Sequence, residues 1–575
     1  MSMSKNIARL AVTAGLTAAL SFGGVMAPVS MAFAAEGATT ATNSITIKKD
    51  DKNGDVKYKA YQIFKADVID GENGKVVSNI DWASDKAKTA VLNYLVAASC
   101  PGITLSSSAQ DVAKYLTDHS EGTGKTTPID NNNLFNGLAK AVEKNVGQTG
   151  ASFAAGEVFQ PKDASGNALQ GYYLFVTDES TLSTDQKPEK NTGTSPIFVV
   201  VGDTLVTVDE KTSIPTVDKQ ILDDDKNKTA KNASDDGWVY VGDSRINQDV
   251  DYKLTGTVAD NIASYIKYEY VFQDTLSKGL VVTKDENDKP KDLHVYIVNG
   301  KNEIEVKDGF EATVTQAGDG QNSELLKVSF DDLKAVKDGK RNVINVDKDS
   351  NVVVTYKAHL TKDASYEATG NPNTVKLVYS NNPMGEGTGI STGKTVTDYV
   401  FRLDVTKVDS ENQDKKLVAG FKVKVVTNED NASVDKWLSA VGSLVNEEQA
   451  FEFTTDESTG KVYIPGLVTG TYQITETTTP AGYNTIAPFT ITVTPQYVNG
   501  KLDKLTVNDN SEMVDPGTAT GATIPLTVQN KKGSGLPLTG LNGVTFTWIA
   551  GGAVLCIGVA HLIHSRKQAE ESEQE

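Results

Sequence analysis

Cysteine and histidine are both scarce in this chain of 575 residues. It has two cysteines, Cys100 and Cys556, and five histidines. Cys556 lies in an apolar run near the C-terminus, so Cys100 stands alone and we expect no intrachain disulfide. His119, His294 and His359 are scattered, without metal-ligand spacing or a Ser/Cys partner. These absences argue against a disulfide framework, a metal centre and a histidine-based catalytic site, and we expect no cofactor.

Clustered positive charge is also missing outside the chain ends. The formal net charge is −19, which argues against nucleic acid as a partner. Carboxylates gather in the run Asp51-Lys52-Asn53-Gly54-Asp55, but this run does not follow the Gly and distal Glu pattern of an EF-hand loop. We therefore interpret it as a turn.

Long apolar runs occur only at the two ends of the chain. At the N-terminus, Lys5 and Arg9 precede an apolar run from Leu10 to Val29. Ala32-Phe33-Ala34 then has the small-x-small form of a signal peptidase site. The sequence predicts a signal peptide over residues 1–34, an exported protein and a mature chain that starts near Ala35.

The second apolar run follows a short motif near the C-terminus, Leu536-Pro537-Leu538-Thr539-Gly540. Val544 to Ile563 is long enough to cross about 30 Å of hydrocarbon as a helix. Arg566-Lys567 follows at once and places residues 564–575 in the cytoplasm. The alternative for this segment is a plain single-pass anchor.

The order of motif, span and basic tail resembles the cell-wall sorting signal of Gram-positive surface proteins. In that family a sortase cuts between the Thr and the Gly of LPxTG and transfers the Thr carboxyl to an amine. The resemblance implies that residues 533–543 are a sorting signal cleaved between Thr539 and Gly540.

About five hundred residues remain between the two processing segments, which is enough for three domains. Residues 35–211 have a mixed α/β pattern, whose elements we expect as strands at Ser44–Lys48, Tyr58–Val68, Gly171–Thr177 and Ile197–Val208 and helices at Trp82–Ala98, Gln110–Asp118 and Asn133–Lys144. Ser108 and Asp111 form a capping-box pattern before the second helix.

From Ile214 onward, short alternating strands and Gly/Asn/Asp turns predict two successive β-sandwiches, at residues 212–398 and 399–532. Ser433–Leu444, with Ser433 as N-cap, predicts a helix inserted in the second sandwich. The predicted fold class is mainly β: tandem Ig-like sandwiches after a mixed α/β domain, with a C-terminal transmembrane helix.

Three strands of the last domain each direct one polar residue into the core. Strand side chains alternate with period two, so Lys407 shares the apolar face of Phe401–Lys407. By the same count, Glu476 and Asn530 lie on the apolar faces of residues 472–476 and 524–530.

This trio has a chemical interpretation. Burial favours the neutral form of both an amine and a carboxylic acid. A neutral lysine can attack the asparagine amide while the acid polarises its carbonyl and moves protons, leaving a Lys–Asn isopeptide bond and ammonia. The alternative is a hydrogen-bonded polar cluster without chemistry.

The run Tyr472-Gln473-Ile474-Thr475-Glu476-Thr477-Thr478-Thr479-Pro480-Ala481-Gly482-Tyr483 resembles the E-box, YxLxETxxPxGY, of collagen-adhesin B-type domains in Gram-positive pilins. Ile474 replaces the Leu of that motif. In that family the E-box Glu promotes an intramolecular Lys–Asn bond. The resemblance therefore implies a Lys407–Asn530 bond with Glu476 as the catalyst.

The middle domain has a similar but looser pattern. Lys219, Asp274 and Asn381 each fall on the apolar face of a predicted strand, and this phase selects Asn381 over Asn382. The set resembles the A-type isopeptide domain of fimbrial subunits, in which an Asp takes the catalytic place. It implies a Lys219–Asn381 bond, the alternative being a strand-end lysine and a turn-forming asparagine. We find no comparable set in the N-terminal domain and expect no bond there.

The whole order of segments resembles a sortase-assembled fimbrial subunit of the SpaA type. In backbone subunits of that family, sortase joins the Thr of one subunit to a pilin-motif lysine of the next. The usual VYPK form is absent here, and Val206-Thr207-Val208-Asp209-Glu210-Lys211 occupies its place. Lys211 is the candidate acceptor; a solvated linker lysine is the alternative.

The resemblance implies a pilin subunit of a Gram-positive fimbrium, secreted, anchored to the cell wall and involved in adhesion. Its implied partners are sortase, other pilin subunits, peptidoglycan and a host-cell or extracellular-matrix ligand. The missing pilin motif favours the alternative, an ancillary or monomeric wall-anchored adhesin, whereas the absence of an extra large binding module favours the pilin. We do not classify the chain as an enzyme, because the expected self-modification is a single turnover.

Overall fold

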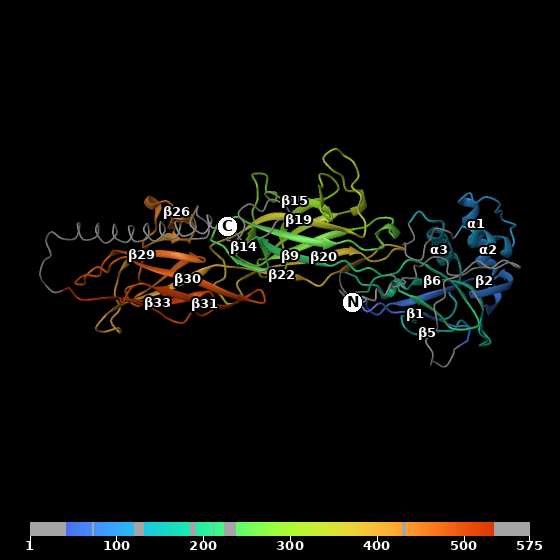
Figure 1. Ribbon diagram of the computed structural model, residues 1–575, viewed down its shortest axis with the longest axis horizontal. Coiled ribbons are helices and arrows are strands. Elements are labelled where there is room, and N and C mark those ends of the chain that lie inside the picture. Colours follow the sequence, from blue (N-terminus) through green and yellow to red (C-terminus); the bar gives the residue numbers. More distant parts are fainter. Residues whose placement is uncertain are drawn as a thin grey trace, which may run out of the picture.

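The structure is a computed structural model that describes residues 42–71, 74–119, 131–184, 191–210, 212–222, 237–427 and 433–533. Its strands form three groups that share no sheet and follow one another in a row (Figure 1). The predicted fold class is confirmed: a mixed α/β domain precedes two β-sandwiches. Within the described ranges no helix has the length and apolarity of a membrane span, and the predicted span at 544–563 lies outside those ranges.

The N-terminal domain has a central sheet covered on both faces. Three helices pack on one face, and the small sheet β5-β1-β8 packs on the other. Double coverage explains why every residue of β6 is buried. The elements are β1 Ile45–Lys48, β2 Lys57–Gly71, β3 Gly74–Trp82, α1 Asp85–Ala97, α2 Ala109–Asp118, α3 Leu134–Asn145, β4 Phe153–Ala154, β5 Val158–Phe159, β6 Gly171–Thr177, β7 Ile197–Val201 and β8 Val206–Asp209.

The predicted elements of this domain are present with small shifts. The capping box of α2 is confirmed, because Ser108 accepts from the Asp111 backbone and the Asp111 side chain accepts from the Ser108 backbone. The predicted strand Ile197–Val208 is instead two strands, β7 and β8, in different sheets.

The middle domain is a sandwich of two seven-stranded sheets, ordered β10-β9-β12-β19-β15-β16 with β14 on β19, and β11-β22-β20-β13-β18-β17 with β21 on β20. Its strands are β9 Val217–Leu222, β10 Trp238–Val239, β11 Val241–Asp243, β12 Val250–Thr257, β13 Tyr270–Leu276, β14 Leu280–Val282, β15 His294–Asn299, β16 Asn302–Glu305, β17 Glu311–Gln316, β18 Glu324–Phe330, β19 Ser350–Leu360, β20 Asn371–Ser380, β21 Thr388–Ile390 and β22 Lys394–Tyr399.

The C-terminal domain packs a four-stranded sheet, β28-β23-β33-β32, against a larger one, β26-β25-β24-β29-β30-β31 with β27 on β24. Its first and last strands, β23 and β33, are parallel neighbours. The strands are β23 Phe401–Asp409, β24 Gly420–Thr427, β25 Trp437–Leu438, β26 Leu444–Val445, β27 Phe453–Thr454, β28 Lys461–Leu467, β29 Gly470–Thr478, β30 Phe489–Val498, β31 Lys501–Asp509, β32 Val514–Pro516 and β33 Thr523–Asn530.

The predicted helix at Ser433–Leu444 is wrong. The segment forms the hairpin β25–β26, in which Trp437 pairs with Val445. Asp435 and Gly442 have positive φ, which a right-handed helix does not accommodate. The apolar spacing of Trp437, Val441 and Leu444 fits one helix face, but the turn chemistry decides the structure.

The middle and C-terminal domains meet at a half-buried polar contact centred on Asp243. Its carboxylate accepts from the Thr469 backbone N–H at 2.6 Å and from the Tyr497 hydroxyl at 2.9 Å. Arg245, buried beside it, donates to the Tyr472 hydroxyl at 2.9 Å. These bonds join β11 and the residues after it to β29, β30 and the turn before β29.

We predict that Asp243→Ala loosens this seam. The substitution leaves the Thr469 N–H and the half-buried Tyr497 hydroxyl without their acceptor, at a cost of about 1 kcal/mol per group. Hydrogen exchange followed by mass spectrometry should show faster exchange at the Thr469 amide. Asp251→Ala is the control, because that half-exposed carboxylate pairs with Lys357 inside the middle domain. Equal exchange in the two variants would contradict the assignment.

Candidate functional site

The C-terminal domain brings Lys407, Glu476 and Asn530 together in its core. The strand pleat explains the burial: residues of β23 and β33 alternate between buried and half-buried positions, and Lys407 and Asn530 both fall on the buried side. Each of the two is fully buried, and Glu476 is 5% exposed. In the parallel ladder Lys407 lies opposite Val528, two residues before Asn530, and Glu476 reaches them from β29 of the facing sheet.

The Glu476 carboxylate contacts both of the other residues. Its Oε1 lies 3.0 Å from Lys407 Nζ, and its Oε2 accepts from Asn530 Nδ2 at 3.1 Å. Asn530 Nδ2 also donates to the Asn484 carbonyl at 2.9 Å, while its Oδ1 is buried and accepts no hydrogen bond from the described residues. The Ile486 N–H donates to Oε2 at 3.1 Å. The acid is therefore held with one oxygen on the amine and the other on the amide nitrogen.

Burial makes the Lys407 amine far less basic than an exposed lysine. It lowers the pKa of Lys407 to about 8, against the opposing effect of Glu476. A lowered pKa raises the fraction of the lysine that is neutral near pH 7 above that of an exposed lysine. The neutral amine is the nucleophilic form.

The end of the E-box-like run folds over this site. Gly482 has a φ of +84°, a conformation that favours glycine, and the chain turns there. The Tyr483 hydroxyl donates to the fully buried Asp409 carboxylate at 2.8 Å. Asp409 in turn lies opposite Asn530 in the ladder. The turn thus holds the Asn484 carbonyl against the Asn530 amide.

The middle domain places a second lysine against a second carboxylate. Lys219 on β9 and Asp274 on β13 come from opposite sheets and are both buried, with Nζ 2.5 Å from Oδ2. The rings of Tyr252 and Tyr356 lie 5.3 Å and 5.4 Å from Nζ. Burial lowers the pKa of Lys219 to about 8, opposed by Asp274.

Asn381 is not part of this second site, so its predicted pairing with Lys219 is corrected. Asp274 lies opposite Val375 in the ladder. Asn381 is six residues further along, about 20 Å at 3.3 Å per residue. Its amide instead donates to the backbone carbonyls of Ser183 and Asn191, at 3.0 and 3.2 Å. Asn381 therefore belongs to the contact between the N-terminal and middle domains.

A different asparagine of β20 occupies the place that was predicted for Asn381. Asn373 is fully buried, and its Nδ2 donates to the Tyr356 hydroxyl at 2.8 Å. The same hydroxyl lies 3.1 Å from Lys219 Nζ. Asn373 shares the strand face of Asn381, eight residues earlier, so the period-two pattern could have found it but could not choose between them.

The N-terminal domain has no buried lysine among its described residues. Its buried carboxylate, Glu210, accepts from the Tyr58 hydroxyl at 2.6 Å and from the Asp50 backbone. The candidate acceptor Lys211 lies outside the described residues, as do the sorting-signal residues Leu536, Pro537, Leu538, Thr539 and Gly540.

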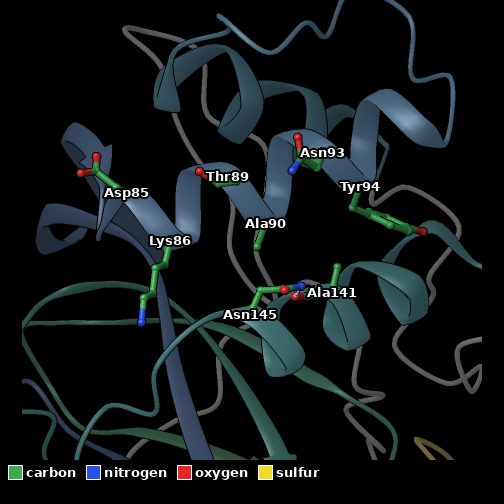
Figure 2. Close-up of a pocket in the computed structure, with 8 residues that line it drawn as sticks. All are labelled: Asp85, Lys86, Thr89, Ala90, Asn93, Tyr94, Ala141 and Asn145. Carbon is green, nitrogen blue, oxygen red and sulfur yellow. Dashed lines mark hydrogen bonds between the residues drawn. The ribbon is translucent and has the colours of Figure 1, made fainter.

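A groove of about 560 Å³ crosses the surface of this domain between α1 and α3 (Figure 2). Asp85, Lys86 and Asn93 from α1 and Asn145 from α3 line it. No histidine or cysteine lines the groove. Across the described residues no group of His, Cys, Asp and Glu side chains is placed to hold a metal ion.

Residues 401–510 match the family described as "SpaA: Prealbumin-like fold domain". None of the curated proteins compared with the chain shows significant sequence similarity to it.

Similar solved structures include three pilins. The T6 backbone pilin of serotype M6 Streptococcus pyogenes is 14% identical over 87% of this chain and 100% of its own, with a TM-score of 0.46. The major pilin SpaD from Corynebacterium diphtheriae is 15% identical over 85% and 97%, with a TM-score of 0.42. BcpA, the major pilin subunit of Bacillus cereus, is 20% identical over 67% and 92%, with a TM-score of 0.33.

The family match covers β23 to β31 and includes Lys407, Glu476 and the whole E-box-like run. Residues 401–510 are therefore similar to SpaA-type prealbumin-like domains.

Proposed function

We propose that this chain is a structural pilin subunit that cross-links itself through Lys–Asn isopeptide bonds. The observation that carries the proposal is the fully buried Lys407, in contact with Glu476 beside Asn530, in a SpaA-type domain. A buried ammonium is unfavourable unless it is paired, and a cross-link removes that charge for good. The carboxylate lies in ion-pair contact with the nucleophile and accepts a hydrogen bond from the leaving nitrogen, so one acid can exchange protons with both.

In the C-terminal domain the reaction joins Lys407 to Asn530. Glu476 takes a proton from the lysine ammonium, and neutral Nζ attacks Cγ of Asn530. The C–Nδ2 bond then breaks as Glu476 returns the proton to the departing nitrogen. The new amide nitrogen gives its excess proton to the freed carboxylate, and the departing ammonia takes that proton away as ammonium. One Nζ–Cγ bond has formed, one C–Nδ2 bond has broken and the carboxylate is regenerated. Each molecule reacts once, so the chain is a self-modifying structural protein and no enzyme.

In the middle domain we propose Lys219 and Asn373 as the bonded pair, with Asp274 as the acid. The Lys219 amine and the Asn373 amide nitrogen both hydrogen-bond to the Tyr356 hydroxyl. Asn373 replaces Asn381 because Asn381 is engaged by the N-terminal domain.

Each bond closes a loop of more than a hundred residues. If the chain-entropy effect of a disulfide applies here, each bond contributes on the order of 5 kcal/mol by restricting the unfolded chain. A long extracellular chain without disulfides gains in this way the resistance to force that a fibre requires.

Assembly completes the proposed function. The exported chain, with domains at 35–211, 212–398 and 399–532, is cleaved by sortase between Thr539 and Gly540. The Thr539 carboxyl is joined to a lysine of the next subunit, Lys211 being the candidate, or to peptidoglycan. The product is a cell-wall-anchored fimbrium at the Gram-positive surface, where it serves in adhesion to a host-cell or extracellular-matrix ligand.

We expect the mature chain, residues 35–539, to weigh less than its sequence mass by two ammonias. Glu476→Ala should restore the mass of one, because the C-terminal bond then lacks its proton carrier. Glu512→Ala, an exposed carboxylate in the same domain, is the control and should keep both losses. A wild-type mass equal to the sequence mass would exclude both bonds.

Asn373 and Asn381 make a matched pair of variants in the middle domain. Asn373→Ala should restore one ammonia and abolish the linked peptide that contains Lys219. Asn381→Ala should leave that linked peptide intact, because its amide contacts only the N-terminal domain among the described residues. Peptide mapping by mass spectrometry measures both results. If Asn381→Ala abolished the linked peptide and Asn373→Ala left it intact, Asn381 would be the bonded residue.

The fibre itself is tested by identifying what is attached to Thr539 in cell-wall extracts. We expect a peptide in which the Thr539 carboxyl is joined to a lysine side chain of this same protein. The sequence of the attached peptide would identify the acceptor lysine, which is Lys211 or another. Thr539 found only on the peptidoglycan cross-bridge would contradict the pilin proposal and favour a monomeric anchored adhesin.

A further inference from the structure

The Tyr356 hydroxyl is the hub of the middle-domain site. It donates to Asp274 Oδ2 at 2.5 Å and receives hydrogen bonds from Asn373 Nδ2 at 2.8 Å and Lys219 Nζ at 3.1 Å. The side chain is fully buried, and its ring stacks on Tyr252 at 5.6 Å between centroids. One oxygen thus contacts the acid, the nucleophile and the leaving nitrogen.

The C-terminal site has no such intermediary among its described residues. There Glu476 Oε2 accepts directly from Asn530 Nδ2 at 3.1 Å. Aspartate is one methylene shorter than glutamate, and Asp274 makes no hydrogen bond to the Asn373 amide nitrogen. The Tyr356 hydroxyl lies between Asp274 and Asn373. It donates a hydrogen bond to the carboxylate and accepts one from the amide nitrogen.

We propose that Tyr356 is a catalytic residue of the middle-domain cross-link and carries a proton from Asp274 to the departing nitrogen of Asn373. This inference rests on the proposed isopeptide function and deepens it. It makes the two sites chemically distinct: a single glutamate carries the proton in one, and an Asp–Tyr pair carries it in the other.

The proposed step balances as follows. Asp274 accepts one proton from the Lys219 ammonium, and neutral Nζ attacks Asn373 Cγ. Tyr356 then gives its hydroxyl proton to Nδ2 and takes from Asp274 Oδ2 the proton that came from the lysine. The Cγ–Nδ2 bond breaks and ammonia forms. The new amide nitrogen loses its excess proton to the freed Asp274 carboxylate, and the departing ammonia takes that proton away as ammonium. Tyrosine and aspartate end in the protonation states in which they began.

Two further features of the site suit this role. Burial, reinforced by the Asp274 charge, raises the pKa of Tyr356 well above its usual value, so the hydroxyl keeps a proton to deliver. Asp274 Oδ1 and Asn373 Oδ1 are both buried and have no hydrogen-bond partner among the described residues. The amide carbonyl is thus not tied to another donor when attack begins.

The test is the rate of bond formation in Tyr356→Phe. The mature chain is produced by cell-free synthesis, and samples taken over time are digested and scored for the linked peptide containing Lys219 and Asn373. Loss of a positioned proton donor should slow this bond by about a hundredfold. The Lys407–Asn530 bond in the same molecule should form at the wild-type rate and reports that the chain has folded.

Tyr252→Phe is the matched control. Tyr252 is equally buried, stacks on Tyr356 and lies beside Lys219, but its hydroxyl donates to Asp398 and not to Asp274. It should cross-link at the wild-type rate. A Tyr356→Phe variant as fast as wild type would overturn the proposal, and so would equal slowing in both variants, because that would indicate packing alone.

A rescue experiment addresses the reach of the acid. In the double variant Asp274→Glu with Tyr356→Phe, the longer carboxylate should contact the Asn373 amide as Glu476 contacts Asn530, and the bond should form faster than in Tyr356→Phe. A double variant as slow as Tyr356→Phe, with its Lys407–Asn530 bond formed normally, would count against the relay. Absence of the linked peptide from the wild type would instead refute the proposed middle-domain bond itself.

Discussion

The placement of a lysine amine inside each sandwich is the constraint on which the rest of this structure depends. A buried ammonium is unfavourable unless it is paired and hydrogen-bonded. Lys219 and Lys407 each meet a carboxylate from the facing sheet, and in each case burial lowers the lysine pKa to about 8. The two sheets must close at one register for this pairing to exist. The same contact that satisfies the charge also sets up a nucleophile, an acid and an amide.

The two sites pair their buried lysine with residues from different combinations of strands. The C-terminal domain brings its lysine and asparagine from parallel neighbouring strands and its acid from across the core. The middle domain brings its lysine and a tyrosine from one sheet and its acid and asparagine from the other. The geometry is therefore conserved at the level of contacts, a carboxylate touching an amine, and not at the level of strand topology.

The alternation of strand side chains was enough to predict most of both sites. It selected Lys407, Glu476, Asn530, Lys219 and Asp274, and all five are buried in the contacts described. It failed where Asn371, Asn373 and Asn381 share one face, because an even number of residues preserves the phase and only the strand pairing shows which one meets the site.

Other features depend on contacts that no local pattern encodes. Tyr356 occupies an ordinary core position of an apolar strand, and only the fold reveals that its hydroxyl meets three polar groups. Ser433–Leu444 has helical spacing, yet positive φ at Asp435 and Gly442 closes a hairpin. The helices of the N-terminal domain were predictable to within a few residues because their caps, such as Ser108 and Asp111, are local.

The two ends of strand β20 make hydrogen bonds to different parts of the molecule. Asn373 near its start donates to the Tyr356 hydroxyl beside Lys219, and the Asn381 amide just past its end donates to a backbone carbonyl of the N-terminal domain. In the proposed cross-linked form, β20 would end in a covalent bond to Lys219 on one side and in hydrogen bonds to the neighbouring domain on the other. Tension on the N-terminal domain would then pass along this one strand, and the hydrogen bonds between the domains would be the weaker links in series.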